Sequence, residues 1–225
     1  QERRAENLLR SLVQSSLSKY NLGGDSPDLP AGRRILVPGQ VEDDASILTG
    51  AGKVKNNLDL LRTTRTANPD AVIIYKPHPD VEAGLRNGEI EAEELADVIA
   101  TKADPAALFD HGDEVWAMAS LMGFEALLRG VQVTTLGAPF YSGWGLTQDL
   151  SKQPRRRQAR PSLLGLVHAA LIDYPRYCDP ITGLPCPVEV AVRRLQSGEI
   201  PHPGLANRAL SKLQGLMATY AHLWR

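Results

Sequence analysis

The chain has 225 residues, of which 43% are hydrophobic and 23% are charged; these proportions are typical of a globular protein of one large domain. A formal net charge of −1 excludes the strongly basic surface of most nucleic-acid-binding proteins, so we expect no nucleic-acid partner. No apolar run approaches the length that spans a bilayer. The chain begins with Gln1 in a charged helical pattern that lacks the apolar core of a signal peptide. Because no initiator Met is present, we expect a piece excised from a longer protein, with a processed chain as the alternative.

The first 33 residues predict a helix followed by a linker. Apolar side chains recur at helical spacing over residues 3–18, with charged side chains off that face. Residues 19–33 are rich in glycine and proline, which indicates a boundary between this helix (1–18) and the domain that follows.

Residues 34–200 predict one Rossmann-like domain, in which strands and helices alternate around a doubly wound parallel sheet. The runs at 35–37 and 71–75 are continuously apolar, as in central parallel strands that are covered on both faces. Residues 201–225 predict a C-terminal helix whose apolar face we expect to be exposed, or to pack on the first helix or on a missing half of the protein. The expected strands are 35–37, 71–75, 97–99, 115–119 and 131–136, and the expected helices are 53–67, 105–109, 121–129, 162–172, 188–197 and 205–224.

A cluster of polar side chains follows the first strand. Gln40 precedes three consecutive carboxylates, Glu42, Asp43 and Asp44. At the carboxyl end of a parallel strand, such a cluster lies where open α/β sheets bind ligands. Because three adjacent anions repel, we expect at least one to face solvent or to pair with a cation such as Lys53, Lys55 or Lys76. The alternative is that Asp43 or Asp44 merely caps a turn or helix.

Lys76, His78 and Pro79 follow the second strand. The prolines on both sides of His78 restrict the backbone and can fix where its imidazole points. A histidine with a lysine nearby is suited to bind a phosphate; the alternative is an incidental histidine in a turn. His202-Pro203 has no strand before it, and we assign it no role.

A third candidate follows the strand at 115–119. Ser120 and Leu121 stand at the start of a helix, where free backbone N–H groups bind anions. Glu125 lies one turn further, where a carboxylate can accept both hydroxyls of a ribose. The alternative is that Ser120 is an ordinary N-cap and Glu125 a solvated helix residue.

Residues 137–161 predict a long loop of the kind that carries binding residues. Its aromatic part, 139–145, is either a mobile wall of a cleft or ordinary packing. Arg155, Arg156 and Arg157 predict a solvated or disordered patch, with contact to an anionic substrate as the alternative. Cys178 and Cys186 predict free thiols.

Several familiar sites are missing from the sequence. It has no GxGxxG, no GxxxxGK[ST] and no GxSxG, which argues against a nicotinamide cofactor, a P-loop and the common hydrolase nucleophile. It has no zinc-ligand spacing, so we expect no metal and no bound cofactor.

Four segments carry a resemblance to a known family: PGQVEDDASI, IIYKPHPD, SLMGFEALLRG and GAPFYSGWGL. From about residue 19 to about residue 195 the chain resembles the capsule polysaccharide biosynthesis family. These are bacterial transferases of 3-deoxy-D-manno-octulosonic acid (Kdo) that build the lipid-linked oligo-Kdo linker of capsules. The motifs QxxxD (Gln40 to Asp44) and HP (His78-Pro79) are weak alone and specific together.

The resemblance implies a GT-B transferase with two Rossmann-like halves, a CMP-Kdo donor, a glycolipid acceptor and retention to give β-Kdo. By the same resemblance, Asp44 is the nucleophile, His78 and Ser120 contact the phosphate, and Glu125 contacts the ribose. The chain has room for one half only, so we expect the donor-binding half, with the acceptor-binding half as a missing partner. We expect a cytoplasmic protein, with peripheral contact to the inner membrane as a further expectation.

Two other functions stay open at this point. One is a non-catalytic module of the same fold that binds a CMP-sugar or a glycolipid. The other is a different sugar-nucleotide enzyme on a related fold, such as an epimerase. The carboxylate cluster favours chemistry over binding alone.

Overall fold

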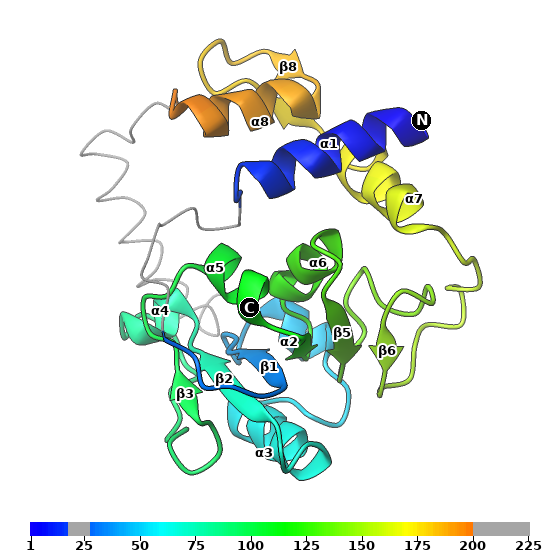
Figure 1. The fold of residues 1–225 in the computed structure, drawn as a ribbon. Coiled ribbons are helices and arrows are strands. Elements are labelled where there is room, and N and C mark those ends of the chain that lie inside the picture. Colours follow the sequence, from blue (N-terminus) through cyan, green and yellow to red (C-terminus); the bar gives the residue numbers. More distant parts are fainter. Residues whose placement is uncertain (18–27, 200–225) are drawn as a thin grey trace, which may run out of the picture. The chain divides into compact units, whose positions relative to one another are not determined.

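A computed structural model describes residues 1–17 and 28–199 of the chain (Figure 1). The chain forms two compact units, Gln1–Tyr174 and Pro175–Arg225, which are described separately below. The expected C-terminal helix at 205–224 and the pair His202-Pro203 lie outside the described residues.

The first unit is built on a six-stranded sheet with the strand order β3-β2-β1-β4-β5-β6. Every neighbouring pair of strands in it is parallel. The chain therefore crosses outward in both directions from β1 and β4, which is the Rossmann topology with its switch point between those two strands. The α/β fold class expected from the sequence is confirmed. The strands are β1 (Arg34–Pro38), β2 (Val72–Lys76), β3 (Val98–Ile99), β4 (Glu114–Ala117), β5 (Gln132–Thr135) and β6 (Gln148–Asp149).

The central strands are buried on both faces, as their continuous apolar sequence predicts. Ile35 and Ile73 are fully buried on one face, where they pack with Leu60 and Leu61 of the helix α3 (Asn57–Ala67). Figure 1 shows α3 on one side of the sheet and the helices α5 (Pro105–His111) and α6 (Leu121–Leu128) on the other. The sheet is thus covered on both sides, and its strand ends are left to form the site.

Two helix boundaries after β1 differ from the expectation. A short helix, α2 (Ala45–Gly50), follows the carboxylate cluster where no helix was expected, because the Asp44 side chain caps it by accepting from the Ser46 N–H at 2.8 Å. The next helix, α3, begins at Asn57 rather than at residue 53. Its start is set by Asn56, whose side chain accepts from the Asp59 N–H. In both places a polar cap sets the helix start more sharply than hydrophobic spacing does.

The N-terminal helix α1 (Glu2–Gln14) contacts α7 (Leu163–Val167) and the π-helical turn η1 (His168–Asp173) of its own unit. Ala5 and Leu8 are buried in it. We had expected this apolar face to be exposed, or covered by the C-terminal helix or by a missing half. The correction is that the continuous helical segment 163–173, itself expected, provides the partner. No helix among the described residues combines the length and the apolar character that a membrane span requires.

The loop at 137–161 is held in place by Arg157, contrary to the expectation of a solvated patch. Its guanidinium donates to the carbonyls of Pro139 at 2.6 Å and Ser142 at 2.9 Å, and lies 5.6 Å from the centroid of the Trp144 ring. The short edge strand β6 also lies in this loop. A planar, multidentate donor can satisfy several loop carbonyls at once, which explains why Arg157 is half-buried.

The second unit contains a two-stranded hairpin, β7 (Tyr177–Cys178) and β8 (Pro185–Cys186), and the helix α8 (Val188–Ser197). Tyr177 pairs with Cys186 and Cys178 with Pro185. Because neighbouring pairs of a hairpin point to opposite faces, the two thiols point apart, and both are free, as expected.

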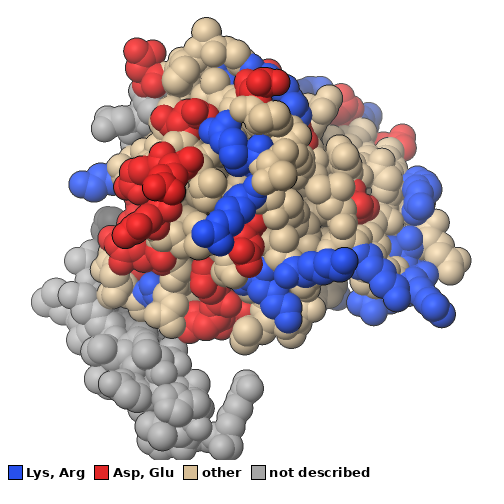
Figure 2. Space-filling view, turned by 90° about the horizontal axis from the view of Figure 1, so that it is seen from below, with Lys and Arg blue, Asp and Glu red and all other residues tan. Residues whose placement is uncertain are grey.

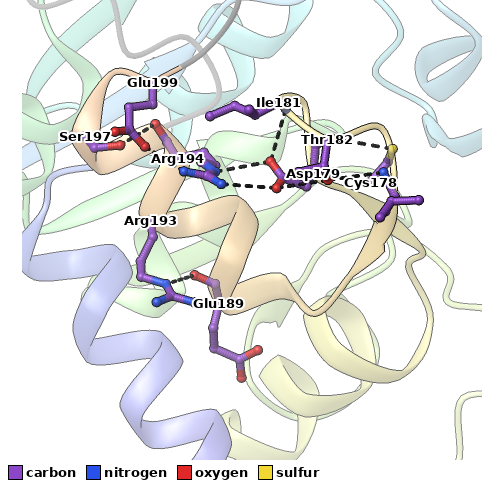
Figure 3. Close-up of polar contacts among 10 residues, drawn as sticks. Cys178, Asp179, Ile181, Thr182, Glu189, Arg193, Arg194, Ser197 and Glu199 are labelled. Carbon is purple, nitrogen blue, oxygen red and sulfur yellow. Dashed lines mark hydrogen bonds and ion pairs between the residues drawn. The ribbon is translucent and has the colours of Figure 1, made fainter.

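A single carboxylate joins this hairpin to α8 (Figure 3). Asp179 accepts from the backbone N–H of Ile181 and from the Arg194 guanidinium at 3.1 and 3.2 Å. Arg194 also reaches Glu199 at 2.6 Å. The charge pair, more than apolar burial, therefore defines how α8 meets the turn of the hairpin.

Although the net charge is close to zero, acidic and basic side chains form separate clusters on the surface. Figure 2 shows one area of the face where Asp and Glu side chains gather and others where Lys and Arg side chains gather. The acidic stretch at 89–97 exposes Glu89, Glu91, Glu93 and Glu94. The net charge of the chain therefore does not describe the electrostatic environment of a ligand, which depends on the individual charged residues around a cavity.

Candidate functional site

An open cavity of about 740 Å³ lies at the carboxyl ends of the strands in the first unit. Residues that follow β1, β2, β3 and β4 all line it, so it spans the switch point between β1 and β4, where open α/β sheets bind ligands. The cavity brings together eight of the ten residues that the sequence singled out: Gln40, Asp44, Lys76, His78, Pro79, Ser120, Leu121 and Glu125. Glu42 and Asp43 are not among the residues that line it.

Gln40 connects the two sides of the switch point. Its side chain is buried, and its Oε1 accepts from the Ala119 N–H at 3.0 Å. Its backbone N–H and C=O both pair with the side-chain amide of Asn57, at 2.9 and 2.8 Å. Gln40 therefore sets the distance between the loop after β1 and the start of α6. Asn57 is fully buried and was not expected from the sequence, because an asparagine near a helix start carries no specific signal.

The three consecutive carboxylates have three different environments. Glu42 accepts from the Asn57 N–H at 2.8 Å, and Asp43 pairs with Arg86 at 2.8 Å. Asp44 caps α2 with its Oδ1 and lines the cavity. The expectation that one carboxylate pairs with a cation is met by Arg86, not by any of the three lysines. Separate partners reduce the repulsion among the three charges.

Lys76 forms an ion pair with Glu82, a carboxylate outside the cluster at 42–44. Its side chain is 5% exposed and its Nζ lies 3.3 Å from Glu82 in the helix α4 (Pro79–Glu82). Because buried charges are stable only when they are paired, Lys76 and Glu82 form one structural unit in the lining of the cavity.

The His78 ring is oriented by the backbone. Its Nδ1 accepts from the Asp80 N–H at 3.2 Å, which makes it the N-cap of α4, and Pro79 occupies the first position of that helix. Since Nδ1 is an acceptor, the neutral ring carries its proton on Nε2. The ring therefore presents an N–H donor from a fixed position.

Ser120 caps α6, and the loop after β5 supports it. Ser120 Oγ accepts from the Met122 N–H, and its carbonyl accepts from the Tyr141 hydroxyl at 2.6 Å. Tyr141 is fully buried, and burial raises the pKa of its hydroxyl. The aromatic loop is thus packed against α6. Glu125 is 7% exposed, so it is not the solvated helix residue of the alternative interpretation.

Two cations that line the cavity, Arg86 and Lys102, were not predicted, whereas Phe140 belongs to the loop 139–145, expected either as a wall of a cleft or as ordinary packing. Phe140 packs against Phe124, with 4.9 Å between the ring centroids, and remains 45% exposed. Lys102 follows the third strand by three residues, so the rule that ligands bind at strand ends could have found it.

Comparison with known proteins identifies the family of the chain. Residues 6–177 match the family described as capsule polysaccharide biosynthesis protein. The chain is 44% identical over 228 residues to the capsule polysaccharide modification protein LipA of Neisseria meningitidis serogroup B, and the match covers 96% of this chain and 32% of LipA. The chain thus spans about a third of the length of that relative.

Two solved structures from Thermosulfurimonas dismutans have the same fold. One, the KpsC beta Kdo 2,4 transferase, is 34% identical with a TM-score of 0.80, over 87% of this chain and 62% of that one. The other, the KpsC beta Kdo 2,7 transferase, is 38% identical with a TM-score of 0.75, over 88% of this chain and 61% of that one. The resemblance inferred from the four sequence segments is confirmed: the chain belongs to the capsule polysaccharide biosynthesis family.

Proposed function

We propose that this chain is the donor-binding half of a retaining β-Kdo glycosyltransferase, which uses CMP-Kdo to build the poly-Kdo linker of a bacterial capsular polysaccharide. One observation carries the proposal: a single cavity at the switch point is lined by the carboxylate, the histidine and the helix start that donor binding requires. Similarity to two Kdo transferases adds support for the sugar.

The phosphate of CMP would lie between His78 and the start of α6. The Nε2–H of His78 supplies one donor, and the first N–H groups of α6 supply others. Glu125, one turn along α6, would accept from the ribose hydroxyls. Lys76 is occupied by Glu82 and would support His78 rather than bind the phosphate directly.

Asp44 would act as the nucleophile. It is exposed and lines the cavity, whereas Asp43 is paired with Arg86 and Glu42 accepts from the Asn57 N–H. Its carboxylate would attack the anomeric carbon of Kdo, and CMP would leave with the electrons of the broken bond. An acceptor hydroxyl would then displace the carboxylate and lose its proton. Two inversions give net retention.

The second half of the enzyme would hold the glycolipid acceptor. A cleft between two halves positions acceptor and donor, and positioning supplies a large part of the rate. We therefore expect the 225-residue chain to bind the donor and to transfer no sugar. An acceptor anchored in a lipid would bring the complete enzyme to the surface of the inner membrane.

One observation favours a second candidate, a module that binds a CMP-sugar without turnover. Asp44 already has a structural role as the cap of α2, and this role alone would explain an aspartate at that position. The longer protein distinguishes the two candidates: incubation with CMP-Kdo and a glycolipid acceptor should give Kdo transfer, and binding without transfer would favour the second candidate.

Calorimetric titration of the chain with CMP, UDP and GDP tests the nucleotide. CMP should bind, and the two diphosphates should bind at least tenfold more weakly, about 1.4 kcal/mol. Equal binding of all three, or preference for UDP or GDP, would refute the CMP-Kdo proposal and favour another sugar-nucleotide enzyme.

A further inference from the structure

The cations that line the cavity differ in whether a carboxylate of the protein already neutralises them. Lys76 is paired with Glu82 at 3.3 Å, and Arg86 with Asp43 at 2.8 Å. For Lys102, no Asp or Glu among residues 1–17 and 28–199 lies within ion-pair distance. Lys102 is exposed and lines the cavity. It therefore has a positive charge that is available to a ligand.

The backbone at Lys102 is held in an unfavourable conformation. Its φ is +54°, in the left-handed region, and the only other described non-glycine residue with a positive φ is Ser16 at +48°. A lysine gains nothing locally from this conformation, which glycine adopts more readily. Residues held in this way persist only where the surrounding structure imposes the conformation, and they are concentrated at functional sites.

Here the surrounding structure is the same network that supports His78. The Lys102 N–H donates to Glu82 Oε1 at 3.2 Å, and Glu82 Oε2 accepts from Lys76 at 3.3 Å. The neighbouring Ala100 N–H donates to the Tyr75 carbonyl at 2.8 Å. Glu82 thus fixes the turn after β3 against the end of β2, and Lys102 is fixed relative to His78.

We infer that Lys102 binds the carboxylate of the donor sugar, an inference that rests on the function proposed above. In CMP-Kdo the carboxylate and the phosphate oxygen are attached to the same anomeric carbon, so two anions lie close together and each needs its own partner. The phosphate has His78 and the start of α6. Neighbouring strands are about 4.8 Å apart, and β3 lies beyond β2 on the side away from β4. Lys102 and Ser120 therefore line opposite sides of the cavity and would contact a bound donor from those two sides.

This assignment makes Lys102 a specificity residue. A donor with a neutral sugar would leave the Lys102 charge without a partner, whereas a 2-ulosonic acid would satisfy it. Hydrogen bonds to charged groups contribute enough to change affinity about tenfold or more. CMP alone, which lacks the carboxylate, would not use this contact.

Calorimetry with two probes, CMP and freshly prepared CMP-Kdo, tests the inference. The measurements are made in an Asp44→Asn background, so that no glycosyl-enzyme forms. Lys102→Gly should weaken CMP-Kdo binding about tenfold and change CMP binding less than twofold. Lys102→Arg, which keeps the charge, should retain most of the affinity for CMP-Kdo.

Stability measurements separate binding from a structural role. Because glycine relieves the left-handed strain, Lys102→Gly should keep or raise the urea midpoint of unfolding while it weakens CMP-Kdo binding. Ser16→Gly is the matched control: it relieves the same kind of strain at a residue that does not line the cavity, so it should not change the affinity for either probe.

Each failure has a distinct meaning. If Lys102→Gly weakens CMP and CMP-Kdo equally, the lysine binds the phosphate and the carboxylate assignment is wrong. Unchanged affinity for both probes, or a lower urea midpoint with a proportional loss of both affinities, also overturns it. If the chain with native Lys102 binds neither probe, the proposed function itself fails and the inference fails with it.

Discussion

Gln40 Oε1 accepts a hydrogen bond at 3.0 Å from the backbone N–H of Ala119, 79 residues further along the chain. This bond joins the loop after β1, which carries Asp44, to the end of β4, where Ser120 begins the next helix. Beyond the pairing of β1 with β4, the buried Gln40 amide thus links the two sides of the cavity and helps to set the spacing between the carboxylate and the helix start.

Replacement of Gln40 should destabilise the unit. Gln40→Met has a similar size and cannot accept the bond, so the buried Ala119 N–H would lose its partner at a cost of about 1–3 kcal/mol. Urea denaturation followed by circular dichroism measures this change. The control is Gln158→Met, the same substitution at an exposed position, which should not change the free energy of unfolding. A Gln40→Met variant as stable as the native chain would show that the bond contributes nothing.

Replacement of His78 should separate ligand binding from helix capping. His78→Ala removes both the Nε2–H and the cap of α4, and should weaken CMP binding by about 1–3 kcal/mol. His78→Asn keeps an acceptor for the Asp80 N–H, so it should preserve stability and still lose affinity. His111, which does not line the cavity, is the control: His111→Ala should bind CMP normally. Native affinity in His78→Asn would refute the phosphate assignment.

Asp44 can be tested with little disturbance of the fold, because Asn is as good an N-cap as Asp. In the complete enzyme, incubation with CMP-Kdo alone should give a covalent Kdo adduct, visible by intact mass and located in the peptide that contains Asp44. Asp44→Asn should abolish the adduct and keep CMP binding, while Asp44→Ala should also lose about 1 kcal/mol of stability with the cap of α2. Asp43→Asn, which loses only its pair with Arg86, should still form the adduct. An adduct on another residue, or near-native transfer by Asp44→Ala, would show that Asp44 is not the nucleophile.

The packing of Tyr141 on α6 predicts a coupled pair of substitutions. A Cβ at Gly123 would overlap the Tyr141 hydroxyl, so Gly123→Ala should cost about 1–3 kcal/mol of stability through overpacking. Tyr141→Phe should cost about 1 kcal/mol by removing the bond to the Ser120 carbonyl. The double variant should be less destabilised than the sum of the two, because the phenyl ring partly relieves the overlap.

Gly50→Ala provides the matched control for Gly123. Gly50 is also a helical residue, the last one of α2. A Cβ added there would meet the Ala119 Cβ at an ordinary 3.9 Å, so Gly50→Ala should be neutral or slightly stabilising. Strict additivity of Gly123→Ala and Tyr141→Phe in urea denaturation would exclude the overlap as the cause.

The second unit should respond to acid through Asp179. The Arg194 guanidinium, followed by the Ile181 N–H, holds the pKa of Asp179 below its ordinary value of 3.8. A carboxyl whose pKa is lowered by folding stabilises the fold above the ordinary pKa, and this contribution is lost as pH falls through the lowered one. The contact between the hairpin and α8 should therefore persist at pH 4 and weaken below that range.

NMR titration of the Asp179 side-chain carbon measures this pKa directly. Arg194→Gln should move the Asp179 pKa up toward its ordinary value. Arg193→Gln is the control, because Arg193 contacts the Glu189 carbonyl instead (Figure 3) and should leave the titration unchanged. Equal titration curves for native and Arg194→Gln chains would exclude the ion pair as the cause.

The amino-acid sequence by itself predicted five of the six strands of the sheet and the strand ends that line the cavity. The continuous apolar runs in β1 and β2 predict strands covered on both faces, and the polar residues directly after them line the cavity at the strand ends. These features are local: hydrophobic spacing and a strand-terminating proline act within a few residues. For that reason Gln40, Asp44, His78 and Ser120 could all be named without coordinates.

Only the tertiary structure decided which side chains pair with one another. Asp43 forms an ion pair with Arg86 and not with a lysine, and Lys76 forms an ion pair with Glu82. Arg157, expected in a solvated patch, holds the aromatic loop. The place of Lys102 after the third strand could be predicted from the sequence, but its lack of a carboxylate partner among the described residues is a property that no stretch of sequence contains. Such pairings depend on the order of the strands in the sheet. This order brings residues that are far apart in the sequence, such as Gln40 and Ala119, within hydrogen-bond distance. No local sequence pattern encodes a distance across the sheet.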